Sequence, residues 1–345
     1  MAIAIRRANL QADRDVLIEA LSQSLLPQSD GRRFDWLYRE CPHGEARVWI
    51  AGDGNGSGIL GAAAVFPRRM YVGGEIRVGC VLGDFFIVPH FRSLGPAVLL
   101  QRACLEAVGS DGLDVCYDFP AAAMVPVYKR LAIESRRQFV RLAKPLKVDR
   151  SIQARVKTPW LASGMSALGN QMLDSRDRLR SHSSDCTLSL HSGLCRDEFS
   201  ALAKAVSAGY GICVERSAEY LNWRYLSHFA RSYELLTARR EGALVAYAVF
   251  THDANNAEIV DLFGVQESAV LRNVISGVVA LLRQRNVMTV SAPVLASHPH
   301  VALFESLGFH AREACPVMVY PPSDHAAGGP GKGDAWFLMQ GDRES

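Results

Sequence analysis

Residues 84–97 read Asp-Phe-Phe-Ile-Val-Pro-His-Phe-Arg-Ser-Leu-Gly-Pro-Ala, and this stretch decides the fold. An apolar run ends at Val88, a short turn follows, and a helix is predicted to begin at Gly95-Pro96. Residues 92–97 fit the pattern Arg/Gln-x-x-Gly-x-Gly/Ala, which points successive N–H groups into one concavity. Unsatisfied N–H groups and the positive end of a helix dipole favour an anion such as pyrophosphate. The pattern therefore predicts a phosphate-bearing ligand, although an ordinary strand-to-helix turn with glycine also fits it.

The residues that follow extend this strand–turn–helix unit. A long apolar helix is predicted over residues 96–108, and the small and polar residues 109–112 end it. Residues 113–119 alternate with period two, as a strand does. Pro126 then opens another helix, which carries Tyr128-Lys-Arg-Leu131.

This order of elements resembles the GNAT family of acyl-CoA-dependent N-acyltransferases. In that family the Arg/Gln-x-x-Gly-x-Gly/Ala loop holds the coenzyme A pyrophosphate, and the tyrosine of a later Tyr-x-x-Leu-Gly-Phe helix lies near the thioester sulfur. The first motif is matched by Val88, Pro89, Phe91, Arg92, Gly95 and Ala97, and the second by Tyr128 and Leu131. Two positions depart from the pattern: Ala132 replaces the usual glycine, and Pro96 removes one N–H from the loop.

The resemblance implies a mixed α/β (α+β) fold, with a twisted, mixed and mostly antiparallel sheet flanked by helices. It implies acetyl-CoA or another acyl-CoA as the cosubstrate, without a metal ion. The residues implied in binding this cosubstrate are Phe86, Ile87, Val88, Arg92, Ser93, Leu94, Gly95, Pro96 and Ala97. Backbone N–H groups of residues 86–88 are expected to polarise the thioester carbonyl.

Three side chains are candidates for proton transfer. Tyr128 is the candidate general acid for the leaving thiolate, and the alternative is a core tyrosine that packs the helix. Asp84 and Asp118 lie on the two strands expected to flank the acyl group. Either aspartate could act as the base if burial raised its pKa, and each could instead be a structural or solvated carboxylate.

The chain also contains an internal repeat. Phe34-Asp-Trp36-Leu-Tyr38 has a counterpart in Leu221-Asn-Trp223-Arg-Tyr225, and each is followed by a small-residue apolar strand, 61–66 or 245–250. Matched features in the same order indicate a duplicated unit. Within the resemblance, this is a tandem GNAT protein.

The second copy is expected to be degenerate. No Gly-x-Gly/Ala turn precedes its predicted helix over residues 271–283, and Phe304 replaces the tyrosine. We therefore expect the following organisation: an N-terminal acyl-CoA-binding domain over residues 1–148, a basic helical linker over 149–190, and a C-terminal domain over 191–345 that shapes a substrate cleft or a dimer contact.

Composition excludes several function classes. A net charge of +3 is too small to favour nucleic acid as a partner. The eight cysteines are scattered singly, which favours reduced thiols over a zinc site. No stretch has the apolar length of a signal peptide or a membrane span, so a cytoplasmic location is expected.

Three functions follow from these observations. The first is an acyl-CoA-dependent, most simply acetyl-CoA-dependent, N-acyltransferase that acts on a small-molecule or sugar amine, as a monomer or homodimer. The second is an aminoacyl or amino-sugar acyltransferase of cell-wall or exopolysaccharide biosynthesis. The third is an inactive acyl-CoA sensor or scaffold, which the departures at Pro96 and Ala132 favour.

Overall fold

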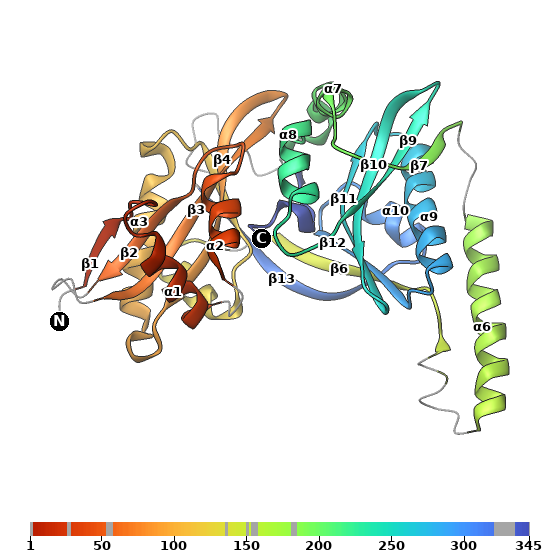
Figure 1. The fold of residues 1–345 in the computed structure, drawn as a ribbon, viewed down its shortest axis with the longest axis horizontal. Helices are drawn as coiled ribbons and strands as arrows, with labels where there is room; N and C mark the ends of the chain where they lie inside the picture. Colours follow the sequence, from red (N-terminus) through yellow and green to blue (C-terminus); the bar gives the residue numbers. More distant parts are fainter. Residues whose placement is uncertain are drawn as a thin grey trace.

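The structure is a computed structural model of a chain built from two similar halves, which lie side by side in Figure 1. The last described residues lie between the two halves. The described residues are 3–25, 29–52, 58–134, 137–149, 152, 158–180, 185–320 and 335–344.

All fourteen described strands belong to one continuous sheet, and twelve of them follow one another along a single path. Its strands are β1 (Ala4–Arg7), β2 (Arg47–Gly52), β3 (Ile59–Val72), β4 (Glu75–Ile87), β5 (Val115–Asp118), β6 (Arg137–Pro145), β7 (Thr187–Leu190), β9 (Glu234–Arg240), β10 (Ala243–His252), β11 (Asn256–Gly264), β12 (Thr289–Leu295) and β13 (His310–Tyr320). They are arranged in the order β1-β2-β3-β4-β5-β13-β6-β12-β11-β10-β9-β7. Along this path the described pairs are antiparallel except β4–β5 and β11–β12, which confirms the predicted mixed, mostly antiparallel sheet.

Helices and short strands complete the fold. The helices are α1 (Arg14–Ser24), α2 (Gly31–Phe34), α3 (Leu94–Ser110), α4 (Val125–Arg130), α6 (Pro159–Arg180), α7 (Asp197–Val206), α8 (Ala218–Leu221), α9 (Ser268–Gln284) and α10 (Val301–Ser306). Single turns of 3-10 or π-helix are η1 (Asp35–Arg39), η2 (Pro89–Phe91), η3 (Ala122–Met124), η4 (Ser207–Tyr210), η5 (Asn222–Leu226) and η6 (Gln340–Asp342). Strand β8 (Ile212–Val214) pairs with β3, and β14 (Trp336–Phe337) pairs with β8.

The first half buries both faces of its sheet. On one face, α3 and α4 pack against alternate residues of the strands, including Cys116 of β5. On the other face, α1, α2 and η1 pack against the intervening residues, including Val115 and Tyr117. This period of two directs Asp118 toward α3 and α4, because it lies two residues after Cys116.

The two halves exchange a strand. β13 follows α10 of the second half but pairs with β5 of the first half, through Met318↔Asp118 to Tyr320↔Cys116. β6 follows α4 of the first half but pairs with β12 of the second half, from Phe139↔Leu295 to Pro145↔Thr289. β6 and β13 also pair with each other, so the two sheets become one. A domain boundary near residue 148 therefore assigns β6 to the first half, although β6 pairs with β12 of the second half.

The repeated tryptophan motif lies where the two halves meet. Trp36 Nε1 donates to the Trp223 carbonyl oxygen at 3.0 Å, and Trp223 Nε1 donates to the Trp36 carbonyl oxygen at 2.8 Å. The two rings stack at a centroid distance of 4.8 Å. Each tryptophan lies on a π-helical turn, η1 or η5, that follows a short helix. The two copies of the repeat are thus related by an approximate twofold arrangement.

Outside the two halves, α6 occupies most of the predicted linker and runs alongside α9 in Figure 1. The domain limits at 148 and 190 stay a prediction. Within the described residues, no helix combines the length and the apolar character that a bilayer crossing requires. No cluster of three or more metal-ligating side chains occurs in that part of the chain. All eight cysteines are free thiols.

Candidate active site

Strand β4 contains a bulge at the point where the site begins. Its register with β3 shifts between Ala62 and Ala64, and Asp84 adopts a φ of +46°. This left-handed conformation is uncommon for a residue with a side chain, although aspartate tolerates it better than most. Arg33 donates to the two oxygens of Asp84 at 2.7 and 2.8 Å, and the Tyr38 hydroxyl donates at 2.7 Å. These buried contacts hold the bulge in place.

The second half repeats part of this arrangement. Asp261 occupies the matching position on β11, and the Tyr225 hydroxyl donates to its Oδ2 at 3.4 Å. Its cation is Arg216, whose Nε lies 3.1 and 3.2 Å from the two oxygens. The aspartate–tyrosine pair is therefore present in both halves, including the one without the predicted phosphate loop. This duplication favours a structural role for Asp84 over the predicted role as base.

Beyond the bulge, β4 and β5 separate. Their parallel pairing covers Gly79–Val81 and Val115–Tyr117 and continues no further among the described residues. A cavity of about 580 Å³ opens at this point. Its walls come from β4, α3, the end of β5 with η3, β13 and the last described residues. The cavity is lined by Leu25, Ala63, Ala64, Leu82, Gly83, Asp84, Phe85, Gln101, Cys104, Asp118, Phe119, Pro120, Ala121, Ala122, Met124, Ala314, Cys315, Pro316, Arg343 and Glu344.

Half-buried Asp118 and buried Tyr128 form a pair at this cavity. The Tyr128 hydroxyl donates to Asp118 Oδ2 and accepts a hydrogen bond from Gln101 Nε2 at 3.1 Å. Asp118 and Gln101 line the cavity, whereas Tyr128 is 1% exposed and is not among the described residues that line it. Burial raises the pKa of Asp118 to about 7, against the hydrogen bond from Tyr128, which lowers it. Burial also raises the pKa of Tyr128 well above its ordinary value.

The predicted phosphate loop forms the start of α3. Leu94 and Gly95 are the first two residues of the helix, so their N–H groups have no acceptor within it. The Ser93, Leu94 and Gly95 amides donate to no backbone carbonyl in the described part of the chain. Pro96 is the third helical residue, so the N–H it lacks is one of the groups that would have faced outward. A Cβ atom on Gly95 would meet no atom within 4 Å, which leaves this turn open to a ligand.

The strand end before this loop presents one further donor. The Val88 amide bonds to the Leu60 carbonyl oxygen at 2.8 Å, so it faces β3. In an antiparallel pair successive residues alternate, which turns the Ile87 amide to the opposite side, toward the separation of β4 and β5. Arg92 Nε reaches the Ile87 carbonyl oxygen on that same side at 3.0 Å. Of residues 86–88, Ile87 therefore has the amide best placed to act on a substrate in the gap.

The second predicted motif has the expected turn despite its substitution. Ala132 adopts a φ of +59°, and the corresponding Gly308 of the second half adopts +89°. The alanine thus takes the left-handed conformation for which glycine is favoured, at a cost in strain. The turn closes through a bond from the Ile133 amide to the Tyr128 carbonyl oxygen at 3.0 Å.

In the second half the equivalent gap is occupied by the chain itself. β11 and β12 pair only over Asn256–Glu258 and Thr289–Ser291 among the described residues. Residues 336–344, which we name the crossing segment, enter the space beyond. The Leu295 amide donates to the Leu338 carbonyl oxygen at 3.0 Å, and Val294 bridges to Met339. In this half, backbone of the crossing segment therefore stands beside β12 where the first half has its cavity.

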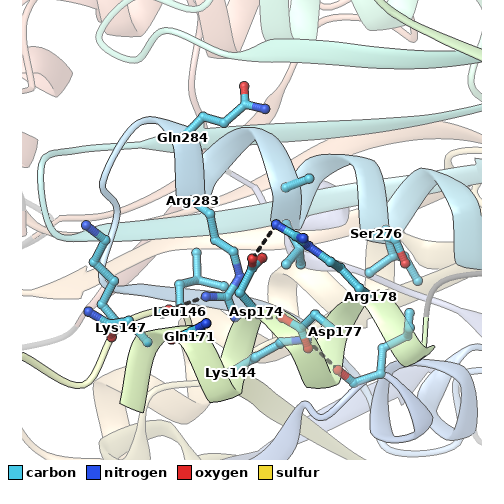
Figure 2. Close-up of a pocket in the computed structure, with 15 residues that line it drawn as sticks. Lys144, Leu146, Lys147, Gln171, Asp174, Asp177, Arg178, Ser276, Arg283 and Gln284 are labelled. Carbon is cyan, nitrogen blue, oxygen red and sulfur yellow. Dashed lines mark hydrogen bonds and ion pairs between the residues drawn. The ribbon is translucent and has the colours of Figure 1, made fainter. Parts of the chain in front are cut away.

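A second cavity, of about 620 Å³, lies between α6 and α9 (Figure 2). Its charged side chains pair with each other: Lys144 Nζ and Arg283 Nη2 each lie 2.6 Å from an oxygen of Asp177. Its lining comes from β6, α6, α9 and the end of α10, and it includes none of the residues that line the cavity at β4 and β5. We assign it no role in the site.

Sequence reasoning did not identify three residues that shape the site. Arg33 holds the bulge, Gln101 holds Tyr128, and Glu344 lines the cavity from the far end of the chain. No spacing rule connects these residues to the motifs at 84–97 and 128–131. The predicted phosphate loop, Asp118 and Tyr128 each carry a local pattern or strand position that can be read without the fold.

Comparisons with solved structures support the fold. The chain superposes on a probable N-acyltransferase from Enterococcus faecalis V583 with a TM-score of 0.66 at 10% identity, over 92% of this chain and 72% of that one. A GCN5-related N-acetyltransferase from Anabaena variabilis gives 0.66 at 14% identity, with the same coverage. An N-myristoyltransferase from Saccharomyces cerevisiae, solved with bound myristoyl-CoA, gives 0.58 at 9% identity, over 92% and 82%. No family model and no curated protein matches the sequence.

Proposed function

We propose that this chain, which has the fold of the GCN5-related N-acetyltransferases, transfers an acyl group from acyl-CoA to a primary amine. One observation carries the proposal: β4 leads from a cavity that contains Asp118 and Glu344 to a turn with free amides at the start of α3. The turn suits a diphosphate, and the cavity suits the reacting groups. The cavity lies at the start of the part of β4 that has separated from β5, and the turn follows the end of that part.

In this proposal the backbone supplies the binding of the donor. The amides of Ser93, Leu94 and Gly95 hold the diphosphate, because they donate to no carbonyl of the described residues and lie at a helix start. The Ile87 amide faces the gap and polarises the thioester carbonyl. Neither task depends on a side chain. The proline at position 96 therefore removes one N–H donor and leaves the amides of Ser93, Leu94 and Gly95 in place.

We assign the proton of the leaving thiolate to Asp118, with Tyr128 as the residue that positions it. An unperturbed thiol has a pKa of about 8.5, so a carboxylic acid with a pKa of about 7 transfers its proton favourably. Tyr128, whose pKa is raised, is a poorer acid, and its hydroxyl lies behind Asp118. The Tyr128–Asp118 pair thus takes the role that sequence reasoning gave to Tyr128 alone.

Acetyl-CoA is the donor to test first, and a small-molecule or sugar amine is the acceptor class. Two cavity carboxylates with raised pKa values favour catalysis over ligand sensing. Keeping such an acid in the protein lowers the stability of the fold, and a site that only binds a ligand does not need one.

The binding assignment is tested by Gly95→Asp, with Gly95→Asn as the matched control of equal size. The added carboxylate lies where the diphosphate is expected, and like charges about 4 Å apart cost about 1 kcal/mol in water and about 4 kcal/mol near a protein surface. We expect the Kd for acetyl-CoA, measured calorimetrically, to rise about tenfold or more relative to the asparagine variant. Equal affinities for the two variants would show that the diphosphate does not bind at this turn.

The Asp118–Tyr128 pair is tested by Tyr128→Phe. In the parent, the hydrogen bond from Tyr128 lowers the pKa of Asp118. The phenylalanine variant lacks this bond, so the pKa of Asp118 rises above about 7. Asp118 must be protonated to donate, so activity falls as pH rises through its pKa. We expect the alkaline limb of the kcat profile to move to higher pH and kcat to fall about tenfold. An unmoved limb would contradict the pairing.

A further inference from the structure

We propose that Glu344, carried into the first half by the crossing segment, accepts the proton of the amine as it attacks the thioester. This inference rests on the proposed acyltransferase function and deepens it, because it gives the second half a part in the chemistry of the first. It also supplies the base that Asp84, committed to Arg33 and Tyr38, does not supply.

Glu344 lies directly against the separated part of β4. A Cβ atom on Gly83 would fall 2.6 Å from Glu344 Cγ and 2.8 Å from Glu344 Cβ, closer than real contacts allow. Only a glycine at position 83 leaves room for this side chain. Gly83 immediately precedes the bulge residue Asp84, so Glu344 is placed at the start of the cavity.

The carboxylate of Glu344 has a free acceptor. Its Oε2 atom is enclosed by protein and accepts no hydrogen bond from the described residues. Buried polar atoms are normally paired, so an enclosed oxygen without a partner among the described residues, on a side chain that lines the cavity, indicates a partner that arrives with the substrate. An amine nitrogen, which carries N–H donors, is a partner of the right kind.

The crossing segment is fixed firmly enough to aim this side chain. The Tyr117 hydroxyl donates to the Asp342 carbonyl oxygen at 2.8 Å, and Arg216 Nη2 lies 2.9 Å from both carboxylate oxygens of Asp342. Arg224 Nε donates to the Gly341 carbonyl oxygen at 2.9 Å. These anchors come from both halves, and they immediately precede the two residues that enter the cavity.

The charged groups around Glu344 differ from those around Asp118. Burial, the largest effect, raises the pKa of Glu344 above its ordinary value, and Asp84 adds to this rise, against Arg343, its own backbone N–H and Arg224, which lower it. Glu344 in turn raises the pKa of Asp118, and Arg33 faces Glu344 from α2. Two neighbouring carboxyl groups cannot readily ionise together, so one is the acid and the other the base.

The reaction balances with these two groups. The amine nitrogen forms the bond to the acyl carbon, and its proton passes to Glu344 Oε2. The carbon–sulfur bond breaks, and the sulfur takes the proton of Asp118. The products are an amide and the free thiol, and solvent then returns a proton to Asp118 and removes one from Glu344.

The test is Glu344→Gln, which keeps the size and removes the base. We expect kcat with acetyl-CoA and a panel of primary amines to fall at least a hundredfold, the Kd for acetyl-CoA to stay within twofold, and the acidic limb of the pH profile to disappear. Glu344→Asp should recover part of the rate. Glu313→Gln, the same change on exposed residue Glu313 of β13, is the control and should match the parent.

A second variant reaches the same residue indirectly. Gly83→Ala forces Glu344 away from β4, so its rate loss should approach that of Glu344→Gln, and the double variant should lose little more. If no amine in the panel is accepted, thioester hydrolysis by water provides the same readout, since it needs the same proton acceptor.

The outcomes separate the two proposals. Parent-like turnover and an intact acidic limb in Glu344→Gln would overturn the role of Glu344 and leave the acyltransferase proposal standing. A parent that binds no acetyl-CoA, or binds it and releases no thiol with either acceptor, would overturn both.

Discussion

Asp118→Asn is expected to lower kcat by about 10²–10⁴-fold, the range typical of a lost general acid, while the Kd for acetyl-CoA stays unchanged. An amide cannot donate the proton that the leaving sulfur requires. Tyr128, itself held by Gln101, can still hold the side chain in place, because the amide oxygen accepts from the tyrosine hydroxyl. The measurement is thiol release across pH, in which the alkaline limb near pH 7 should vanish.

The same variant should unfold no more readily than the parent. The folded chain keeps the proton of Asp118 up to about pH 7, whereas the unfolded chain releases it near pH 4. This residue therefore lowers stability progressively as pH rises from about 4 to 7, and asparagine removes that loss. Urea unfolding at pH 8 checks this: a variant that is both inactive and clearly less stable would indicate a structural role for Asp118 instead.

Arg33→Met is expected to destabilise the fold by about 3–5 kcal/mol, the typical cost of breaking a buried ion pair. The change leaves the Asp84 carboxylate buried with only Tyr38 as a partner, at a residue already in a left-handed conformation. Equilibrium unfolding in urea measures the effect. The bulge that separates β4 from β5 depends on this pair, so acetyl-CoA affinity should fall as well.

Arg6→Met provides the matched control for this result. Arg6 pairs with Asp13 at 2.7 Å, but its side chain is 56% exposed. Solvent screens such a pair, so its loss should cost at most about 1 kcal/mol. Similar losses of stability in the two variants would mean that burial adds nothing to the Arg33–Asp84 pair. The double variant Arg33→Met/Asp84→Asn should recover part of the stability, because it removes the unpaired buried carboxylate.

The strand–turn–helix unit at residues 84–97 could be predicted from sequence because its physics is local. A turn, a glycine and a helix start lie within six residues, and their spacing determines where the amides point. The roles within the cavity are different. Asp118 was found by its position on a strand, but its pairing with Tyr128, and the contact of Tyr128 with Gln101, depend on how α3 and α4 pack on β5. The base could not be found because Glu344 reaches the cavity from 226 residues after Asp118 in the numbering.

The mixed sheet and the repeat were also readable, since alternation and duplicated motifs are written along the chain. The order of strands in the middle of the sheet was not. The sequence of β6 gives no sign that its neighbours are β12 and β13 rather than β5. Which strands pair at the centre of the sheet depends on how the two halves pack together. The sequence pattern of either half alone does not contain this information.

Because β6 and β13 each complete the sheet of the opposite half, gene deletion cannot simply remove the copy that lacks the phosphate cradle. Loss of residues 191–345 would take β13 from beside β5 and leave β6 without neighbours. Exposed strand edges of this kind recruit other chains and aggregate. Each half could therefore stand alone only if its strand were rebuilt beside the strands of its own half.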